Sequence, residues 1–439
     1  MLKVEENNKK IIIFLISFTI ISYFLGYFLD ENSAGGGQGD FVNTWKNLTL
    51  FKSNELFEAL RLTATSDSNI FQSSRIPGVY VFHKLFNPFT NNVDQFRNSV
   101  FIFSILIPIS LFISLKLKFR NINKLYLIFI SSLVFLSPYF RTSAYWGNEE
   151  NFGILTIVIS FICFQLYIKE KKFKKEFIYI NLLAFFSSCC IYFDQKLAFV
   201  PAISLLVILF SNKSVFLKFY LVLIYGLYAI PVLYLFNLWG GIMPSGDATS
   251  RGILQGSFYP QHLGYSITII SFYLLPFILT TKEKINKKFI VKIFNIKKKF
   301  LYSLILIYII YFLLIYNMDN EILLGKGVFY KLAIFSFENL VYQKVFLSLV
   351  IVLSALLIIN FVKKDQEKIF IILFLSLSSI IYWPILQEYF DPLIFIIIFT
   401  YFNYNFDFRI KNILFLYSYF FLFLVMSNLY YLFMLPRLS

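Results

Sequence analysis

This sequence has few histidines and cysteines, and its long apolar runs hold little charge. It contains 2 His and 3 Cys in 439 residues, so a zinc site built from these ligands is not expected. Cys163, Cys189 and Cys190 lie in or beside apolar runs without a CxxC spacing, which favours packing over redox chemistry. We therefore expect no cofactor and no resident metal, and leave only a loosely bound divalent cation open.

The apolar runs themselves hold almost no ionisable side chains. Ion-coupled transporters place such groups at membrane depth, because the coupling ion must be bound there. In this chain the charges stop at the ends of the runs, with Asp194 and Lys196 nearest to membrane depth. This scarcity argues against an ion-coupled transporter.

The chain is instead rich in long apolar runs: 58% of its residues are hydrophobic and 21% are aromatic. This composition is typical of an all-α polytopic membrane protein that lies in a lipid bilayer. The first run is too long for a signal-peptide core and lacks a cleavage pattern, so we expect a retained helix. The sequence predicts about 13 transmembrane helices, at 11–29, 98–115, 125–140, 152–168, 177–193, 197–211, 216–236, 262–281, 300–316, 345–362, 369–386, 391–404 and 412–432.

The net charge of +16 becomes informative once it is divided between the two sides of the membrane. With the N-terminus inside, the inner segments, together with Lys218 at the inner end of its span, hold 27 of the 40 Lys+Arg and 8 of the 24 Asp+Glu, a net 27 − 8 = +19. The outer segments, together with Asp391 at the outer end of its span, hold the other 13 and 16, a net 13 − 16 = −3. This positive-inside pattern predicts a cytoplasmic N-terminus and a site on the periplasmic, extracellular or luminal face. It argues against nucleic-acid binding, because no soluble basic domain carries the charge.

Two outer segments are too long to be simple connectors. Segment 30–97 begins Gly-rich and then places four large apolar residues at helical spacing, which predicts one or two amphipathic helices on the membrane surface. Segment 317–344 shows a similar amphipathic pattern around Gly325-Lys326-Gly327. Since no repeat or linker separates a soluble part, we expect 1–439 to form a single polytopic membrane domain. The four apolar residues of the first segment are Phe41, Trp45, Leu48 and Phe51.

The candidate catalytic residues follow the first apolar run. Asp30 and Glu31 end that run, and Asp40 comes soon after in Gly39-Asp40-Phe41. A carboxylate held at the membrane surface beside glycine and aromatic residues can accept a proton from a sugar hydroxyl. Asp40 can equally be the N-cap of the amphipathic helix. The residues alone leave both interpretations open.

Further polar residues gather in the other outer segments, far apart in sequence. Aromatic rings can stack on a sugar while carboxylates and amides bind its hydroxyls, although an interfacial aromatic belt explains part of the pattern. The Gly-rich loop 239–252 can hold a phosphate through backbone N–H groups. Candidates for a phosphate are Arg75, Arg141, Lys196 and Arg251, and candidates for sugar rings and hydroxyls are Tyr145, Trp146, Glu149, Asn151, Asp194, Gln195, Asp247 and Glu388.

These residues, in this order, resemble the GT-C glycosyltransferases, and most closely the dolichyl-phosphate-glucose α-1,2-glucosyltransferases. The resemblance rests on the first-loop acids together with four short motifs and covers about a tenth of the chain. The first outer loop departs from that subfamily, being Gly-rich where its members carry a His/Pro-containing stretch. The four motifs are Pro77-Gly78-Val79-Tyr80, Arg141-Thr142, the Gly-Gly-Ile and Gly-Asp pairs between Asn237 and Asp247, and Glu388-Tyr389-Phe390 with Pro392.

The resemblance implies a hexosyltransferase that uses a polyprenyl-phosphate sugar donor and a glycan or glycolipid acceptor at the outer face. It implies that a first-loop carboxylate, Asp40 or the pair Asp30 and Glu31, is the catalytic base. We expect an inverting displacement without a metal, because an already anionic phosphate leaves with little new charge. Two alternatives stay open: an O-antigen-type polymerase or ligase, and a flippase or transporter of lipid-linked sugars. The first usually carries its large outer loop late in the chain, and the second needs polar groups through the spans.

Overall fold

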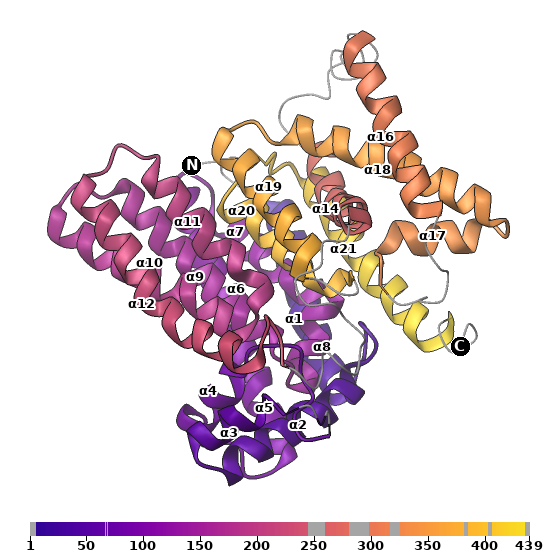
Figure 1. The fold of residues 1–439 in the computed structure, drawn as a ribbon. Coiled ribbons are helices and arrows are strands. Elements are labelled where there is room, and N and C mark those ends of the chain that lie inside the picture. Colours follow the sequence, from indigo (N-terminus) through magenta and orange to yellow (C-terminus); the bar gives the residue numbers. More distant parts are fainter. Residues whose placement is uncertain are drawn as a thin grey trace. The chain divides into compact units, whose positions relative to one another are not determined.

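The computed structural model describes residues 6–65, 67, 69–244, 260–280, 298–316, 325–381, 385–402 and 406–434 (Figure 1). Over these ranges the secondary structure is helical, with no strand, which confirms the predicted all-α class. Of the predicted site residues, Asp247 and Arg251 lie outside the described residues.

Eight helices among the described residues are long and apolar enough to cross a membrane. A ninth span is possible if a bent pair, Lys124–Leu136 with Pro138–Trp146, counts as one. The predicted number of thirteen is therefore not confirmed. The eight are Glu6–Phe28, Val93–Lys118, Glu150–Lys169, Phe173–Phe193, Val215–Trp239, His262–Leu279, Leu340–Phe361 and Ile410–Phe433.

The remaining predicted spans correspond to helices that are bent or short. The predicted span 125–140 breaks between residues 136 and 138 with a bend of 69°. The predicted span 391–404 contains only the eight-residue α20, Leu393–Thr400, about 12 Å of helix against a hydrocarbon core of about 30 Å. The others are α11 (Phe199–Leu209), α19 (Asp365–Ile381) and α16 (Lys298–Tyr316), whose apolar part within the described residues is the short stretch Tyr302–Leu313.

The chain packs into two compact units, one of residues 1–257 with 421–437 and one of residues 258–420. The last long helix, α21 (Ile410–Leu429), is divided between them at Phe420 and Phe421. The prediction of one polytopic domain over 1–439 stays a prediction.

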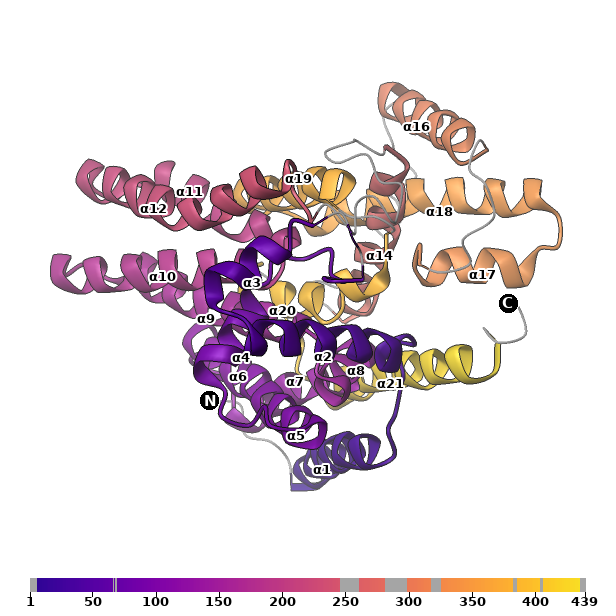
Figure 2. The ribbon, with the colours of Figure 1, turned by 60° about the horizontal axis from the view of Figure 1, so that its bottom comes forward.

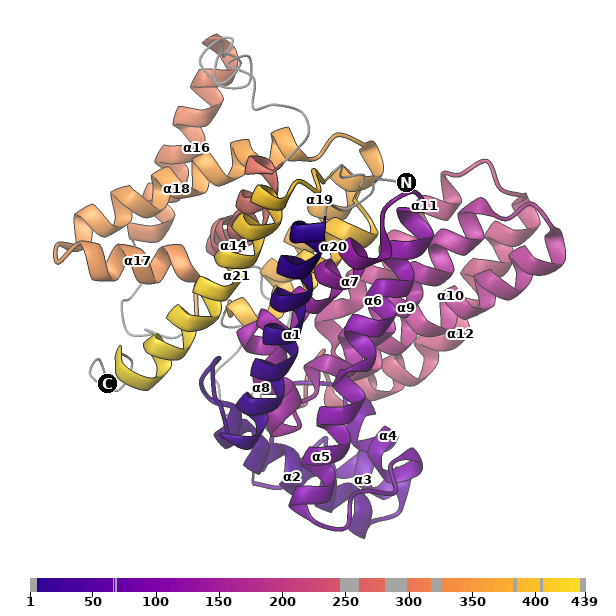
Figure 3. The ribbon, with the colours of Figure 1, turned by 180° about the vertical axis from the view of Figure 1, so that it is seen from behind.

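In the first unit six helices pack in a row, each against the next (Figure 3). The order in space differs from the order in sequence, because α7 lies between α1 and α6. Buried side chains such as Tyr167, Leu183 and Leu221 fill the space between the last three helices. The row consists of α1 (Glu6–Phe28), α7 (Lys124–Ser132), α6 (Leu106–Lys118), α9 (Glu150–Lys169), α10 (Phe173–Phe193) and α12 (Val215–Trp239).

The segment after α1 folds into three helices rather than one or two: α2 (Gly37–Ser53), α3 (Leu56–Leu62) and α4 (Gly78–Phe86). Figure 2 shows α2 beside α4 and α8 (Pro138–Trp146), both of which it contacts. The predicted helical face is confirmed, because Phe41, Leu48 and Phe51 are buried. This segment leads into α5 (Val93–Ser104), which continues into α6.

The second unit is organised around α14 (Pro260–Leu279), which contacts most of its other helices. These are α16, α17 (Val328–Ser336), α18 (Leu340–Phe361), α19 and α20. A glycine pair brackets the start of α17, where Gly325 and Gly327 both have positive φ. The predicted amphipathic segment 317–344 therefore contains, from residue 325 onward, α17 and the start of α18.

Candidate active site in the first unit

Helix α8 places most of the site, and its sequence explains why it forms. Ser137 caps the helix by accepting a hydrogen bond from the Phe140 N–H at 3.0 Å, and Pro138 follows at the first helical position. Gly147, at φ 69°, ends the helix in the left-handed conformation. The next turn, Asn148 to Glu150, starts α9. Residues 141–151 are therefore a buried helix and turn rather than a loop.

Glu31 is anchored by three later parts of the chain. Its Oε2 pairs with Arg141 Nη1 at 2.6 Å, and its Oε1 accepts from the Asn428 amide at 3.2 Å. The Trp146 indole donates to its backbone carbonyl at 3.1 Å. Gly26 makes room for this arrangement, since a Cβ there would lie less than 3 Å from the Glu31 carboxylate. These contacts fix the Glu31 carboxylate in place.

The Arg141 guanidinium is fully engaged with the protein. Its Nε donates to the Phe135 carbonyl at 2.6 Å, and Nη2 donates to the Ser22 hydroxyl at 2.5 Å. The third nitrogen, Nη1, holds Glu31. Since every guanidinium nitrogen has a partner and the side chain is buried, this arrangement does not offer Arg141 to a donor phosphate. Its role here is to hold α8 against the end of α1.

Asp30 is more accessible than Glu31, with its side chain 61% exposed. It pairs with Arg97 Nη2 at 2.5 Å. The Arg97 guanidinium also lies 4.5 Å from the centre of the Trp146 ring and donates from Nε to the Tyr145 carbonyl at 2.9 Å. A cation stacked on an aromatic face and paired with a carboxylate is held in one geometry. Sequence reasoning missed Arg97, whose only signal was its position at the start of an apolar run.

Asp40 lies in the first turn of α2 and is exposed. The helix begins at Gly37 after Gly36, so the N-cap interpretation of Asp40 is wrong. Instead the Asn32 side chain accepts from the Gly37 N–H at 3.1 Å. A Cβ at Gly37 would lie less than 3 Å from Trp146, so this end of α2 packs directly on the indole that binds Glu31. The positive end of the helix dipole favours the ionised carboxylate of Asp40.

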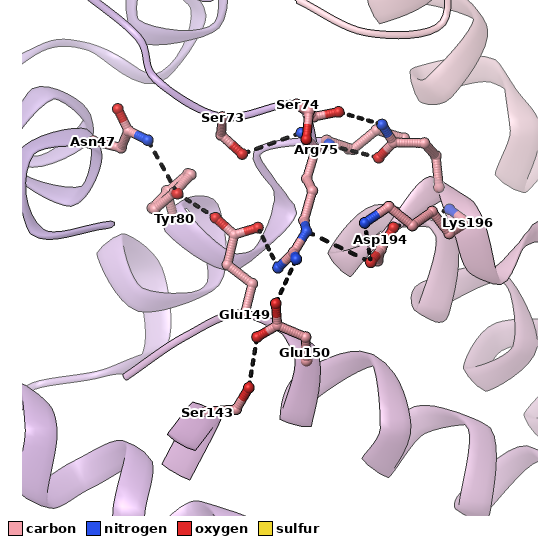
Figure 4. A network of polar contacts seen from close by, with 12 residues as sticks. Asn47, Ser73, Ser74, Arg75, Tyr80, Ser143, Glu149, Glu150, Asp194 and Lys196 are labelled. Carbon is pink, nitrogen blue, oxygen red and sulfur yellow. Dashed lines mark hydrogen bonds and ion pairs between the residues drawn. The ribbon is translucent and has the colours of Figure 1, made fainter. Parts of the chain in front are cut away.

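A second polar cluster surrounds Arg75 (Figure 4). Its guanidinium pairs with Glu150, with Glu149 Oε2 at 3.6 Å and with Asp194 Oδ2 at 3.6 Å. The second oxygen of Glu150 accepts from the Ser143 hydroxyl at 2.6 Å. Three carboxylates from two distant segments thus meet one arginine, which is not available to a phosphate in this arrangement.

Glu149 is the most perturbed member of this cluster. It is 4% exposed, and its Oε1 accepts a hydrogen bond from the Tyr80 hydroxyl, which in turn accepts from the Asn47 amide at 3.1 Å. Burial raises the pKa of Glu149 to about 7, against the opposing effects of Arg75 and of the Tyr80 hydrogen bond. A carboxyl that titrates near neutral pH is suited to proton transfer, although buried ion-pair networks show the same shift. Sequence reasoning missed Tyr80 as a site residue, although it ends the Pro77-Gly78-Val79-Tyr80 motif, and missed Glu150, which follows the candidate Glu149.

The turn at 194–196 closes the cluster from α10. The Asp194 side chain caps η2 (Gln195–Ala198) by accepting from the Lys196 N–H at 3.0 Å. Lys196 Nζ lies 3.7 Å from Asp194 Oδ2, so it too is near a carboxylate. The Gln195 side chain binds the backbone at Ile76, whose N–H it accepts at 3.1 Å. Gln195 is thus committed to positioning the segment that carries Arg75 rather than to a sugar hydroxyl.

Three residues predicted to bind sugar are packed inside the unit. Tyr145 is fully buried, and its hydroxyl donates to the Tyr23 carbonyl at 2.6 Å. Asn151 is also fully buried and donates to Ser104 Oγ at 2.9 Å. Trp146 is buried beneath Arg97. These side chains offer no free ring face or amide donor to a ligand, because α8 is a core helix here.

The other predicted residues lie apart from these clusters. Glu388 lies in η3 (Gln387–Tyr389) of the second unit and is half-buried. Among the described residues no group of His, Cys, Asp and Glu has the arrangement needed to hold a metal ion. The first unit therefore unites Asp30, Glu31 and Arg141 in one cluster, and Arg75, Glu149, Asp194 and Lys196 in another, joined through α8.

The fold defines the class of protein: a helical protein with several segments able to span a membrane. Comparisons with known protein families, curated proteins and solved structures find no match.

Proposed function

We propose that the protein is a membrane glycosyltransferase of the GT-C type, which transfers a hexose from a polyprenyl-phosphate donor to a glycan or glycolipid at the outer face. The exposure of Asp40 in the first turn of α2, soon after the first candidate span, carries this proposal. Carboxylates follow the first candidate span at positions 30, 31 and 40, and later arginines pair with the first two. Asp40 lies at the helix end that packs on Trp146.

In the proposed reaction Asp40 takes the proton of an acceptor hydroxyl. The hydroxyl oxygen forms its bond to the anomeric carbon as the bond from that carbon to the phosphate oxygen breaks, which inverts the anomeric configuration. The leaving group is a polyprenyl phosphate, which departs with the bonding electrons. Lys196 and Arg251 remain the cations that we propose to bind this phosphate. Such contacts stabilise the negative charge of the leaving phosphate without a metal.

We place α2 to α4 at the outer membrane surface. Large apolar side chains on these helices face outward, among them Phe57 at 73% and Phe86 at 70% exposed. Amphipathic helices with such faces lie in the headgroup region. This placement brings Asp40 to the level at which the phosphate of a lipid-linked sugar sits.

The test is hexose transfer from a synthetic polyprenyl-phosphate hexose by purified protein, with Asp94→Asn as a matched control for Asp40→Asn. Both aspartates are exposed in the first turn of a helix, so both changes lose the same helix-dipole interaction. As a general base, Asp40 contributes about 10²- to 10⁴-fold to the rate. We expect a loss of this size for Asp40→Asn and near-normal transfer for Asp94→Asn. Normal transfer by Asp40→Asn, with loss in Asp30→Asn, would reassign the base, and loss of activity in EDTA would overturn the metal-free mechanism.

One observation favours a second candidate, a proton-coupled transporter of lipid-linked sugars. Glu149 is a buried carboxyl that titrates near pH 7 among opposite charges, a combination found in proton relays. Proteoliposomes that move the lipid-linked sugar across the bilayer without an acceptor, in response to a pH gradient and only with Glu149 intact, would support it. Transfer to an acceptor with no such movement would exclude it.

A further inference from the structure

Lys326, in the second unit, is a buried lysine that has no acidic partner among the described residues. It is 8% exposed, and its Nζ donates to the Tyr330 hydroxyl at 3.2 Å. The ammonium lies 4.4 Å from the centre of the Tyr330 ring and 5.8 Å from that of Tyr265. No carboxylate among the described residues lies within ion-pair distance of it. Lysines are rarely buried unless paired, because an isolated charge loses its hydration.

The backbone around Lys326 is built to hold it inward. Gly325, Lys326 and Gly327 have φ of 86°, 57° and 84°, three consecutive left-handed residues. Only glycine fits on either side, since a Cβ at Gly325 would lie less than 3 Å from the Ile385 carbonyl oxygen and one at Gly327 equally close to Ile269. The Lys326 N–H donates to that same Ile385 carbonyl at 2.7 Å. The backbone on both sides of Lys326 is therefore held in one conformation, which keeps the lysine in its buried position.

This environment leaves the ammonium incompletely satisfied. A lysine has three N–H donors, and the described residues provide one hydrogen-bond acceptor together with two ring faces. Burial lowers the pKa of Lys326 to about 8, so the group is still mostly charged at pH 7. An anion with several acceptor oxygens would use the remaining donors and stabilise the charged state.

We propose that Lys326, with Tyr330 and the start of α17, forms a binding site for a phosphate group. A phosphate has enough acceptor oxygens for both the ammonium and the phenol. Leu332 and Phe335 on α17 are exposed apolar residues, which suits the phosphate of a lipid. Inorganic phosphate has the same chemistry, so the experiment separates the two sources. The site does not depend on glycosyl transfer.

The first experiment measures the reactivity of Lys326 in the full chain, in nanodiscs of phosphatidylcholine. Amine labelling is followed by mass spectrometry at this lysine, between pH 6 and pH 10. We expect labelling to fall about tenfold or more when phosphatidic acid is added to the bilayer, because an anion raises the pKa of the amine and covers it. Protection by phosphatidic acid alone identifies a lipid phosphate, and protection by millimolar inorganic phosphate as well identifies a general phosphate site. Protection by neither overturns the proposal.

The second experiment compares Lys326→Met with Lys344→Met. Lys344 is also buried, at 5% exposed, so both changes remove one buried positive charge and keep the side-chain length. Loss of a charge-assisted hydrogen bond predicts about 10- to 100-fold weaker phosphatidic acid binding by native mass spectrometry for Lys326→Met. Lys344→Met should bind within about twofold of the wild type, and Lys326→Arg should retain most of the affinity. Unchanged binding by Lys326→Met, or an equal loss in Lys344→Met, overturns the proposal, and neither result depends on whether the protein transfers sugars.

Discussion

The stability of the first unit should depend on pH through Glu149. Its ordinary pKa of 4.5 is raised to about 7 in the folded protein. A raised carboxyl pKa favours folding while the group is protonated, so the contribution is complete below about pH 4.5 and lost as the pH rises through 7. The difference of 7 − 4.5 = 2.5 corresponds to about 3 kcal/mol in total, most of which is lost between pH 5 and pH 8.

Glu149→Gln removes this titration while keeping an oxygen that can accept the Tyr80 hydrogen bond. We expect the free energy of unfolding, measured by denaturant titration in nanodiscs, to fall by about 2–3 kcal/mol more in the wild type than in the variant from pH 5 to pH 8. Glu58→Gln, an exposed glutamate of α3, serves as the control and should follow the wild type. The carboxylic-acid C=O band in infrared difference spectra should disappear with Glu149→Gln. Parallel pH profiles for wild type and Glu149→Gln would refute the reasoning.

Three further changes probe packing and ion pairs in the same unit. Gly78→Ala places a Cβ less than 3 Å from a main-chain carbonyl and should lower the free energy of unfolding, measured thermally, by about 1–3 kcal/mol. Gly39→Ala, whose Cβ meets nothing within 4 Å, should raise it by about 0.5–1 kcal/mol. Glu31→Gln and Arg141→Met should each cost about 3–5 kcal/mol by leaving a buried partner unpaired, and the double variant should cost clearly less than their sum. Arg97→Lys should cost about 1 kcal/mol and alter tryptophan fluorescence, because lysine cannot keep the stacked, paired geometry.

The helical class and the face of α2 could be predicted from sequence because both depend on local periodicity. The signal for the break after α7 is also local in the sequence. Ser137-Pro138 followed by Gly147 is typical of a helix that is capped at both ends. A hydropathy average does not reveal this break, because an apolar helix pair gives the same average whether it is straight or bent. The predicted number of spans is not confirmed for another reason. Every residue of α20 is buried by protein, and hydropathy does not distinguish burial in protein from burial in lipid.

For the candidate site, the sequence pointed to polar residues but not to the pairs that they form. Arg75, Glu149 and Asp194 come from separate segments, and their meeting depends on how α4, α9 and α10 pack. A cationic side chain considered without its partners suggests a phosphate ligand. The same cation beside a carboxylate from a distant segment is a structural ion pair, as Arg141 with Glu31 demonstrates. Long-range pairing of this kind has no local signature in one sequence.

The charge balance around Arg75 has a consequence for any phosphate-bearing substrate. Glu149, Glu150 and Asp194 carry three negative charges when ionised, and Arg75 with Lys196 supplies two positive ones. Half-protonation of Glu149 near pH 7 brings the cluster closer to neutrality, without a surplus of positive charge. A phosphate would thus have to separate these cations from carboxylates, which costs several kcal/mol for a buried pair. The Lys326 ammonium has no carboxylate of the described residues within ion-pair distance, so a phosphate bound there would involve no such separation.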